Sequence, residues 1–421
     1  MNYFEKKQWI RLSVCAVIVI VAALFLTGII GGKHMTYQMP DAAGKAGDGE
    51  GDSAHAVGAA VAVSMGRNSE NHVVTSYLEQ DPYLVNIYEG YGFAKDYGSA
   101  RGHSYTLEDV AKTARPHPKA NCITCKTDDF TRLVNTEGVG VYSRAFDEVM
   151  PLMQETISCY TCHGEEGAAT GRLEVTHSYV NTALGSAAAD IDPAILSCGQ
   201  CHIEYYFTPS DSETMMPYHN AAEMTPEAIL AYYDAMDFYD WEQPGTGTRM
   251  LKAQHPEMET VLGSSHYAMT GMTCADCHMP REKTEDGIEY SSHYFVSPLQ
   301  SEAILESCAK CHGGPENVKS MVQGIQEKVT AREREVGNRL SGLKDLLTAA
   351  VAEGRLPEER LEEVRKLHRE AQWYFDYCYV ENSEGAHNSA LSLACLDTAD
   401  EKISQATALL QEAGVTAASG N

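Results

Sequence analysis

The chain has 421 residues, of which 43% are hydrophobic and 22% are charged, so it can bury a core and is not disordered throughout. Its 59 Asp and Glu outnumber its 32 Lys and Arg, which gives a formal net charge of -27. This excess makes nucleic acid a poor partner, because binding to phosphates needs a basic face. The simplest role of the excess is a solvated surface, and an anionic small substrate would need local positive charge to enter.

The first 33 residues have the pattern of an export signal or a membrane anchor. Three basic residues precede an uncharged apolar run at 12–30, and a run of this length is near the lower limit for spanning a bilayer. Residues 31–35 contain no small-x-small cleavage motif, so an uncleaved anchor is favoured over a cleaved signal. The basic residues keep the N-terminus in the cytoplasm, so the rest of the chain is expected outside the cytoplasmic membrane.

Residues 34–75 are predicted to be a flexible linker. The segment 41–60 is rich in Gly, Ala and Asp and has no hydrophobic periodicity. From Ser76 onward the chain becomes rich in Tyr, Phe and Gly, and we predict a catalytic body over 76–315. Between 122 and 312, short helical fragments are interrupted by Cys motifs, Pro and Gly.

The C-terminal region, 316–421, is predicted to consist of long helices. The segment 318–353 has apolar residues at spacings of three, four and seven, which indicates an amphipathic helix of unusual length. A second helical pattern begins at Pro357, and a third covers roughly 389–413. Helices this long suggest packing against a second copy of the chain, and an intramolecular hairpin bundle is the alternative. Strand patterns are scarce, so the predicted fold class is mainly α.

Ten of the 13 Cys form five pairs at positions i and i+3: Cys122 and Cys125, Cys159 and Cys162, Cys198 and Cys201, Cys274 and Cys277, and Cys308 and Cys311. Four pairs are followed directly by histidine, namely His163, His202, His278 and His312. Cys-x-x-Cys-His is the pattern of covalent haem attachment, in which two thioethers fix the porphyrin and the histidine is held under the iron. A zinc site needs paired knuckles that converge on one metal, and a redox dithiol needs a single motif, so neither accounts for the recurring histidine. Covalent haems are expected to replace much of the side-chain core of the body.

The remaining pair, Cys122 and Cys125, is followed by Lys126, so an amine takes the place of the imidazole. Lysine binds iron only as the neutral amine. A haem with a displaced ligand and Lys126 in solvent is the alternative. Electron-transfer haems usually have two protein ligands, whereas a reaction centre leaves one position open. The Lys126 haem is therefore the predicted site of catalysis.

From Asp81 to about Lys402 the sequence closely resembles the pentahaem ammonia-forming cytochrome c nitrite reductases. The Cys-x-x-Cys-Lys motif is specific to part of that family, and four further segments carry the resemblance: 91–103, 109–115, 203–207 and 252–256. The resemblance implies a mainly α multihaem cytochrome c with a haem-packed core and long C-terminal helices. It also implies five covalent haem c groups and one calcium ion.

The resemblance further implies roles for individual residues. Second axial ligands of four bis-histidine haems would be His103, His293, His387 and His266, for the haems of Cys198, Cys159, Cys274 and Cys308 respectively. Calcium would be bound by Glu204, Tyr205, Lys252 and Gln254. The catalytic set would be Arg115, Tyr205, His255 and Lys126, with His255 protonated so that it and Arg115 hold the nitrite oxygens.

The implied reaction is the six-electron reduction of nitrite to ammonium, with four bis-histidine haems as relays. The implied partners are a membrane quinol-oxidising multihaem cytochrome as electron donor and a second copy of the chain in a homodimer. One rival is a non-enzymatic electron carrier with six-coordinate iron throughout, and another is a reductase of hydroxylamine or sulfite. Cys378 and Cys395 have no role in the resemblance, so a disulfide and two buried thiols both stay open.

Overall fold

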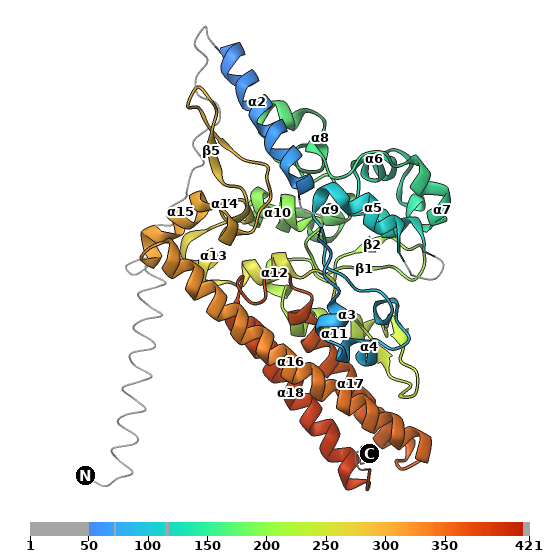
Figure 1. Ribbon diagram of the computed structural model, residues 1–421. Helices are drawn as coiled ribbons and strands as arrows, with labels where there is room; N and C mark the ends of the chain where they lie inside the picture. Colours follow the sequence, from blue (N-terminus) through green and yellow to red (C-terminus); the bar gives the residue numbers. More distant parts are fainter. Residues whose placement is uncertain (1–49, 71–72, 114–117, 416–421) are drawn as a thin grey trace, which may run out of the picture.

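The computed structural model describes residues 50–70, 73–113 and 118–415. The described chain is mostly helical with very little strand, which confirms the predicted mainly α fold class (Figure 1). The anchor predicted at residues 1–33 lies outside this described part. Within the described ranges, no helix is both long enough and apolar enough to cross a membrane.

The body is built from short helices, of which the longest has 12 residues. They are α3 (Tyr77–Gln80), α4 (Tyr83–Ile87), α5 (Thr106–Ala111), α6 (Asp128–Glu137), α7 (Phe146–Val149), α8 (Cys159–Thr170), α9 (Ser178–Leu184), α10 (Pro193–Gly199), α11 (Pro226–Ala235), α12 (Glu257–Leu262), α13 (Ser265–Thr270), α14 (Cys274–His278) and α15 (Glu302–His312). Turns of 3-10 helix connect them: η1 (Arg67–Glu70), η2 (Gly92–Ala94), η3 (His103–Tyr105), η4 (Ala120–Ile123), η5 (Val139–Ser143), η6 (Met150–Leu152), η7 (Gly185–Asp190), η8 (Ala221–Glu223) and η9 (Pro298–Gln300).

The strands of the described chain form three antiparallel pairs: β1 (Tyr206–Phe207) with β2 (Thr214–Met215), β3 (Trp241–Glu242) with β4 (Arg249–Met250), and β5 (Arg281–Lys283) with β6 (Glu289–Ser291). In register, Tyr206 lies opposite Met215, Trp241 opposite Met250 and Glu282 opposite Tyr290. These short pairs act as hairpins that position loops, because two or three residues a strand are too few for a sheet core.

Local side-chain bonds decide where some of these helices begin. At the start of α14, Thr273 and Asp276 form a reciprocal capping box, so the helix starts directly at Cys274. Gly164 has a φ of 64° and breaks the regular helix directly after His163, in a conformation that favours glycine. The sequence therefore fixes the backbone on both sides of the Cys motifs.

The three long C-terminal helices are confirmed as α16 (Pro315–Glu353), α17 (Glu358–Tyr379) and α18 (Ser389–Glu412), which run side by side (Figure 1). Several of their apolar side chains are at most 2% exposed: Val329, Val336, Leu340, Leu343, Leu347, Phe375, Leu396, Ile403 and Leu410. The spacing of these residues in α16 places them along one stripe of the helix. The helices thus bury their apolar stripes within one chain, and pairing with a second copy stays a prediction.

Cys378 and Cys395 are both buried free thiols, so the structure contains the thiol alternative rather than the disulfide. The Cys378 Sγ donates to Glu333 Oε1 at 3.2 Å. Burial raises the pKa of this carboxyl group to about 7. Both partners therefore remain protonated more readily than they would in water.

The prediction of a flexible linker at 34–75 is wrong over the part that the structure describes. Helix α2 (Glu50–Gly66) and η1 occupy 50–70. Ser64 Oγ accepts the backbone N–H of His293 at 2.9 Å, and Asn68 bonds the carbonyl of His293 at 2.7 Å and the N–H of Phe295 at 3.0 Å. The Gly and Ala content suggested a coil, but these tertiary bonds hold the segment as a helix against the body.

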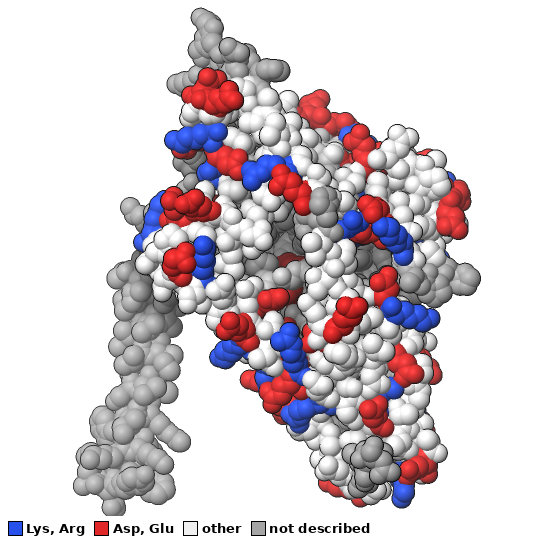
Figure 2. All heavy atoms as spheres, viewed as in Figure 1, with Lys and Arg blue, Asp and Glu red and all other residues white. Residues whose placement is uncertain are grey.

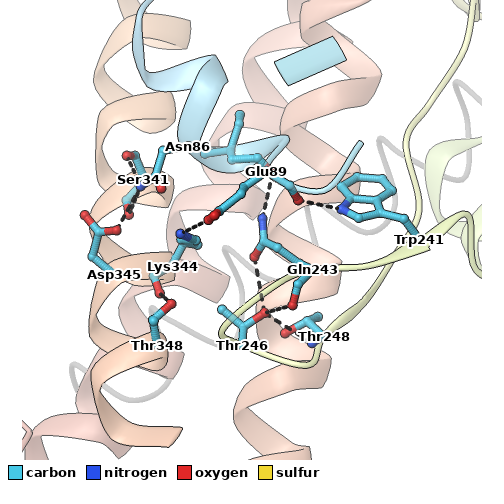
Figure 3. Close-up of polar contacts among 11 residues, drawn as sticks. Asn86, Glu89, Trp241, Gln243, Thr246, Thr248, Ser341, Lys344, Asp345 and Thr348 are labelled. Atoms are coloured by element: carbon cyan, nitrogen blue, oxygen red, sulfur yellow. Dashed lines mark hydrogen bonds and ion pairs between the residues drawn. The ribbon is translucent and has the colours of Figure 1, made fainter. Parts of the chain in front are cut away.

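The body and the C-terminal helices are joined by a polar junction (Figure 3). The buried Lys344 ammonium of α16 forms an ion pair with Glu89. Trp241 Nε1 donates to the Glu89 carbonyl at 3.1 Å, and Gln243 Nε2 donates to the Ile87 carbonyl at 2.8 Å. The exit of α4 is therefore fixed both to α16 and to the β3–β4 hairpin. On the outside, acidic and basic side chains are interspersed over the face in view, as expected of a solvated surface (Figure 2).

Candidate functional site

The five Cys pairs lie in helical turns. Cys122 is in η4, Cys159 begins α8, Cys198 is in the last turn of α10, and the last two pairs lie in α14 and at the end of α15. Positions i, i+3 and i+4 share one face of a helix, so both sulfurs and the following side chain point to the same side. All ten side chains are free thiols that are half-buried or exposed, as attachment to a porphyrin requires.

Motifs that are far apart in the sequence are neighbours in space. The thiols of Cys125 and Cys201 lie within 4.8 Å of each other, and those of Cys198 and Cys274 are close enough to interact electrostatically. The fourth and fifth motifs are also within electrostatic range of each other. The Lys126 motif therefore lies beside the third motif, which in turn lies beside the fourth.

Each of the four histidines that follow a Cys pair has a second imidazole opposite it. The ring centres are 6.3 Å apart for His163 and His293, 6.3 Å for His202 and His103, 6.0 Å for His278 and His387, and 6.0 Å for His312 and His266. Two imidazoles on opposite sides of one metal have ring centres roughly 6 Å apart, because each metal–nitrogen bond is about 2 Å and each ring centre lies about 1 Å beyond its nitrogen. The spacing of all four pairs fits an iron between the rings.

The outer nitrogens of several of these rings already have partners. Nδ1 lies 2.8 Å from the Arg172 carbonyl in His163, 3.0 Å from the Ser291 carbonyl in His293, and 3.2 Å from the Val296 carbonyl in His278. A backbone carbonyl at Nδ1 fixes the tautomer and leaves Nε2 for a metal, which is the usual arrangement of a ligating histidine. The residues present therefore fit covalently attached haem.

Lys126 follows Cys125 at the end of the η4 turn. Its N–H donates to the Ile123 carbonyl at 3.0 Å, and its carbonyl accepts from Thr106 Oγ1 at 2.6 Å. Burial lowers the pKa of His103 to about 4, and the positive charges of His202 and Lys126 add to this effect. Lys126 is thus half-buried and held from both sides of its backbone near the imidazole pair of the third motif.

His255 lies close enough to Lys126 for their charges to interact. Burial lowers the pKa of His255 to about 4; Glu257 opposes this shift, whereas Lys126 adds to it. The imidazole is therefore neutral at neutral pH, and the expectation of a protonated His255 is wrong for this arrangement. The reason is desolvation by the fold, which the sequence alone does not report.

The remaining two catalytic candidates differ in what the structure shows of them. Arg115 lies outside the described residues. Tyr205 is half-buried between the buried Glu204 and the start of β1, and its ring meets Phe207 edge-to-face with the centres 5.6 Å apart. Tyr205 therefore lies beside Glu204, another of the predicted calcium residues.

The predicted calcium residues form one buried group. Glu204 accepts the Gln254 N–H at 2.5 Å and the Tyr233 hydroxyl at 3.1 Å, and Gln254 Nε2 donates to the Lys252 carbonyl at 2.9 Å. Burial raises the pKa of Glu204 well above its ordinary value. A fully buried carboxylate beside a carbonyl and an amide oxygen matches the oxygen ligands that calcium prefers, and a cation would offset the burial of the charge.

Sequence reasoning missed Glu259 beside this cluster and the surroundings of the Lys252 ammonium, since Lys252 was expected only as a calcium ligand. Glu259 is 1% exposed; its Oε1 accepts from the Glu204 N–H at 2.8 Å, and its Oε2 has no described partner. The Lys252 ammonium lies 4.6 Å from the centre of the Phe93 ring and 5.3 Å from that of Tyr97. Glu259 could have been considered as the second acidic residue after the 252–256 segment, following Glu257, but the aromatic box around Lys252 required the fold.

His177 was also missed. It is 3% exposed, with Nδ1 at 2.8 Å from Gln200 Oε1 and Nε2 at 3.1 Å from the Thr124 carbonyl. It therefore bridges the first Cys motif to the third. No motif surrounds His177 in the sequence, so only its tertiary contacts identify it.

Five haem-attachment motifs on a helical body, four of them with paired imidazoles, define a multihaem c-type cytochrome. Comparison with known proteins agrees: the chain belongs to the cytochrome c552 family, whose model matches residues 58–421. It is accordingly an oxidoreductase. A cytochrome c-552 of Aliarcobacter butzleri is 32% identical over 376 residues, which covers 81% of this chain and 71% of that protein.

Among solved structures, the chain is similar to the catalytic subunit of the cytochrome c nitrite reductase of Desulfovibrio desulfuricans, which has been described with two calcium sites. The two share 28% identity and superpose with a TM-score of 0.74, over 84% of each chain. The family and this structural likeness support the mainly α multihaem fold over most of the length.

Proposed function

We propose that this protein reduces nitrite to ammonium at the Lys126 haem, with the four bis-histidine haems as electron relays. The observation that carries the proposal is the contrast between the motifs: four histidines face a second imidazole at 6.0–6.3 Å, whereas the first motif, Cys122 and Cys125, ends in Lys126 near His255. The likeness to a cytochrome c nitrite reductase supports nitrite as the substrate. Lys126 would supply an amine to this iron in place of an imidazole, which sets this haem apart from the four relays as the reaction centre.

Five covalent haems would be held by the ten paired cysteines, the four following histidines, Lys126 and the four opposite imidazoles. When bound, they would supply an iron that binds nitrite and a store of electrons. The protein itself must then orient nitrite, supply protons and provide positive potential. Conversion to ammonium and two waters takes up six electrons and eight protons.

The neutral His255 would donate one N–H to a nitrite oxygen and relay protons through its other nitrogen. Because this imidazole carries no charge, we assign the positive potential to Arg115 and to the buried Lys252 ammonium. The phenol of Tyr205 would serve as a second proton donor. This division of roles lets an anion enter a protein with a net charge of -27.

One calcium ion would be bound by the Glu204 carboxylate, the carbonyls of Tyr205 and Lys252, and the side-chain oxygen of Gln254. Rotation of the Gln254 amide by half a turn would present that oxygen in place of the nitrogen that now donates to Lys252. The ion would neutralise the buried Glu204 and fix Tyr205 beside the substrate. The calcium sites of the similar Desulfovibrio enzyme support this assignment.

We place the body on the outer side of the cytoplasmic membrane, held by an uncleaved anchor at residues 1–33. A membrane quinol-oxidising multihaem cytochrome would deliver the electrons. A homodimer would form through the faces of α16, α17 and α18 that the intramolecular packing leaves exposed.

Anaerobic turnover tests the proposal. The purified protein is given nitrite and a reduced dye, and ammonium is quantified against dye oxidised, with hydroxylamine and sulfite as comparison substrates. We expect one ammonium for every six electrons, together with a high-spin haem signal that changes when nitrite is added. Six-coordinate spectra throughout and no ammonium would leave only an electron carrier.

A further inference from the structure

The outer nitrogens of the paired imidazoles do not all have the same kind of partner. Three of them meet backbone carbonyls, as described above. His387 instead places its Nδ1 2.6 Å from Glu381 Oε1, and Glu381 is only 4% exposed. The imidazole opposite, His278, has the ordinary carbonyl of Val296. This pair therefore has one neutral and one carboxylate partner.

The Glu381 carboxylate is held in place by its own loop, which connects α17 to α18. The Ser383 hydroxyl donates to Oε2 of Glu381 and accepts the His387 N–H at 2.9 Å. Gln326 of α16 donates to the Ser383 carbonyl at 3.2 Å. The geometry between carboxylate and imidazole is therefore set by the loop and by α16, and does not depend on a mobile surface contact.

A second carboxylate near a paired imidazole provides an internal comparison. Glu257 lies 4.0 Å from Nδ1 of His202, beyond hydrogen-bonding distance, and its other oxygen accepts from Asn382 of the same loop at 2.5 Å. Glu257 thus has a competing partner, whereas Oε1 of Glu381 faces the imidazole directly. Of the two carboxylates, only Glu381 is placed to share a proton with an iron ligand.

We propose that Glu381 is a positioning residue that gives His387 imidazolate character and thereby lowers the reduction potential of the haem at Cys274 and Cys277. The inference rests on the proposed ligation of that haem by His278 and His387. A charge-assisted hydrogen bond to the outer nitrogen raises the basicity of the ligand, and a more basic ligand stabilises the ferric state.

A lower reduction potential at the Cys274 motif affects electron flow because of where this motif lies. The fourth motif lies beside the third, where Cys274 and Cys198 interact, and the third lies beside the Lys126 motif. A lower potential at the fourth site makes transfer of its electron to the third site more favourable: the fourth haem is oxidised as the third is reduced. Glu381 therefore favours electron flow toward the Lys126 site.

The test compares Glu381→Gln with wild type in the full holoprotein, by redox titration followed through the low-spin haem signals in electron paramagnetic resonance. The substitution keeps an oxygen acceptor and removes the charge. We expect one low-spin haem to become easier to reduce by about tenfold in its ratio of reduced to oxidised form, which is about 59 mV for one electron, with the others unmoved. Glu384→Gln removes the same charge from an exposed position on the same loop and should move none.

A second variant guards against a loss of folding in Glu381→Gln. Ser383→Ala removes the hydrogen bond that the Ser383 hydroxyl donates to Oε2 of Glu381. The carboxylate then has more negative charge to share with His387, so the same haem should become harder to reduce. Four low-spin haems in wild type with no shift in either variant would overturn the role of Glu381 alone. Fewer than four low-spin haems in wild type would overturn both this inference and the proposed ligation beneath it.

Discussion

The C-terminal helices and the haem-binding body obtain their order in different ways. In α16, α17 and α18, apolar side chains at helical spacing bury one another almost completely. In the described part of the body, no helix exceeds 12 residues; many of its apolar side chains join the same core as the long helices, and a second, smaller cluster surrounds Ile123, Phe130 and Tyr142. The first region is specified by its apolar side chains alone, whereas the second also carries the Cys motifs and the paired imidazoles.

Substitutions in the two regions should therefore change different properties of the protein. In the helical region, a change of one buried side chain should alter global stability and leave the spectra of the haems untouched. In the body, a change of one ligand should alter the iron and leave the stability of the long helices untouched. The polar junction of Glu89 and Lys344 connects the two regions, so a substitution there should change both global stability and the haem spectra.

The largest effect is expected from Lys126→His. The variant should keep its haem, because Cys122 and Cys125 are unchanged, but lose nitrite turnover by about a hundredfold or more, since even outer-shell changes cost up to that much. Dye-driven turnover and haem content are the measurements. An unchanged rate would remove Lys126 from the mechanism and leave the first motif equivalent to the other four.

The next effect is expected in the helical region, from Trp373→Ala. Trp373 in α17 is fully buried and donates its Nε1–H to the Pro226 carbonyl at 2.9 Å. The free energy of unfolding should fall by about 3–5 kcal/mol, measured by urea titration of the helical signal. Trp373→Phe is the matched control and should lose only about 1 kcal/mol, because it keeps most of the ring and loses the hydrogen bond. Altered haem spectra in folded Trp373→Ala would show that the two regions are not independent.

A pH effect of intermediate size is expected from His368 in the same helix. It is fully buried, with Nδ1 at 3.1 Å from Thr248 Oγ1, and burial followed by the charge of Lys344 lowers its pKa from 6.5 to about 3. Between about pH 6.5 and 3 the imidazole is protonated in the unfolded chain and neutral in the native protein. Acidification therefore lowers the free energy of unfolding by at most about 1.4 kcal/mol for each pH unit. Glu333, whose pKa is raised to about 7, acts in the opposite direction below neutral pH.

The contribution of His368 is isolated by comparing wild type with His368→Gln in urea titrations from pH 7 to pH 4. The variant has no titrating imidazole at this position, so the difference in unfolding free energy between the two proteins should shrink or reverse as the pH falls. A difference that stays constant over this range would show that the pKa of His368 is the same in the native and the unfolded protein.

The smallest effect is expected from Asn68→Ala in η1, which removes the bonds to the backbone of His293 and Phe295. Loss of these bonds should cost about 1–3 kcal/mol locally and increase the fraction of five-coordinate haem at the Cys159 site. Magnetic circular dichroism of the high-spin signal is the measurement. Ser69→Ala, which removes a hydroxyl that within the described residues bonds the Gly66 carbonyl of its own turn, is the control and should change nothing.

Features that are local in the chain could be predicted from the sequence. Cys pairs and the residue after them are chemically complete within five positions, so the haem-attachment motifs and the exceptional Lys126 could be recognised directly. The three long helices followed from apolar spacing, which repeats along the chain and needs no partner to be seen. The pairing of His266 or His387 with a particular motif was implied only by resemblance.

Features that depend on burial and on contacts between distant segments became visible in the tertiary structure and could not be predicted from the sequence. The fold placed four imidazole pairs at one common spacing and turned part of the expected linker into a helix that holds His293. It also made His255 neutral and put Glu381 against His387. Desolvation and the direction of a side chain are set by what the fold packs around a residue, and neither is recorded in the order of the residues themselves.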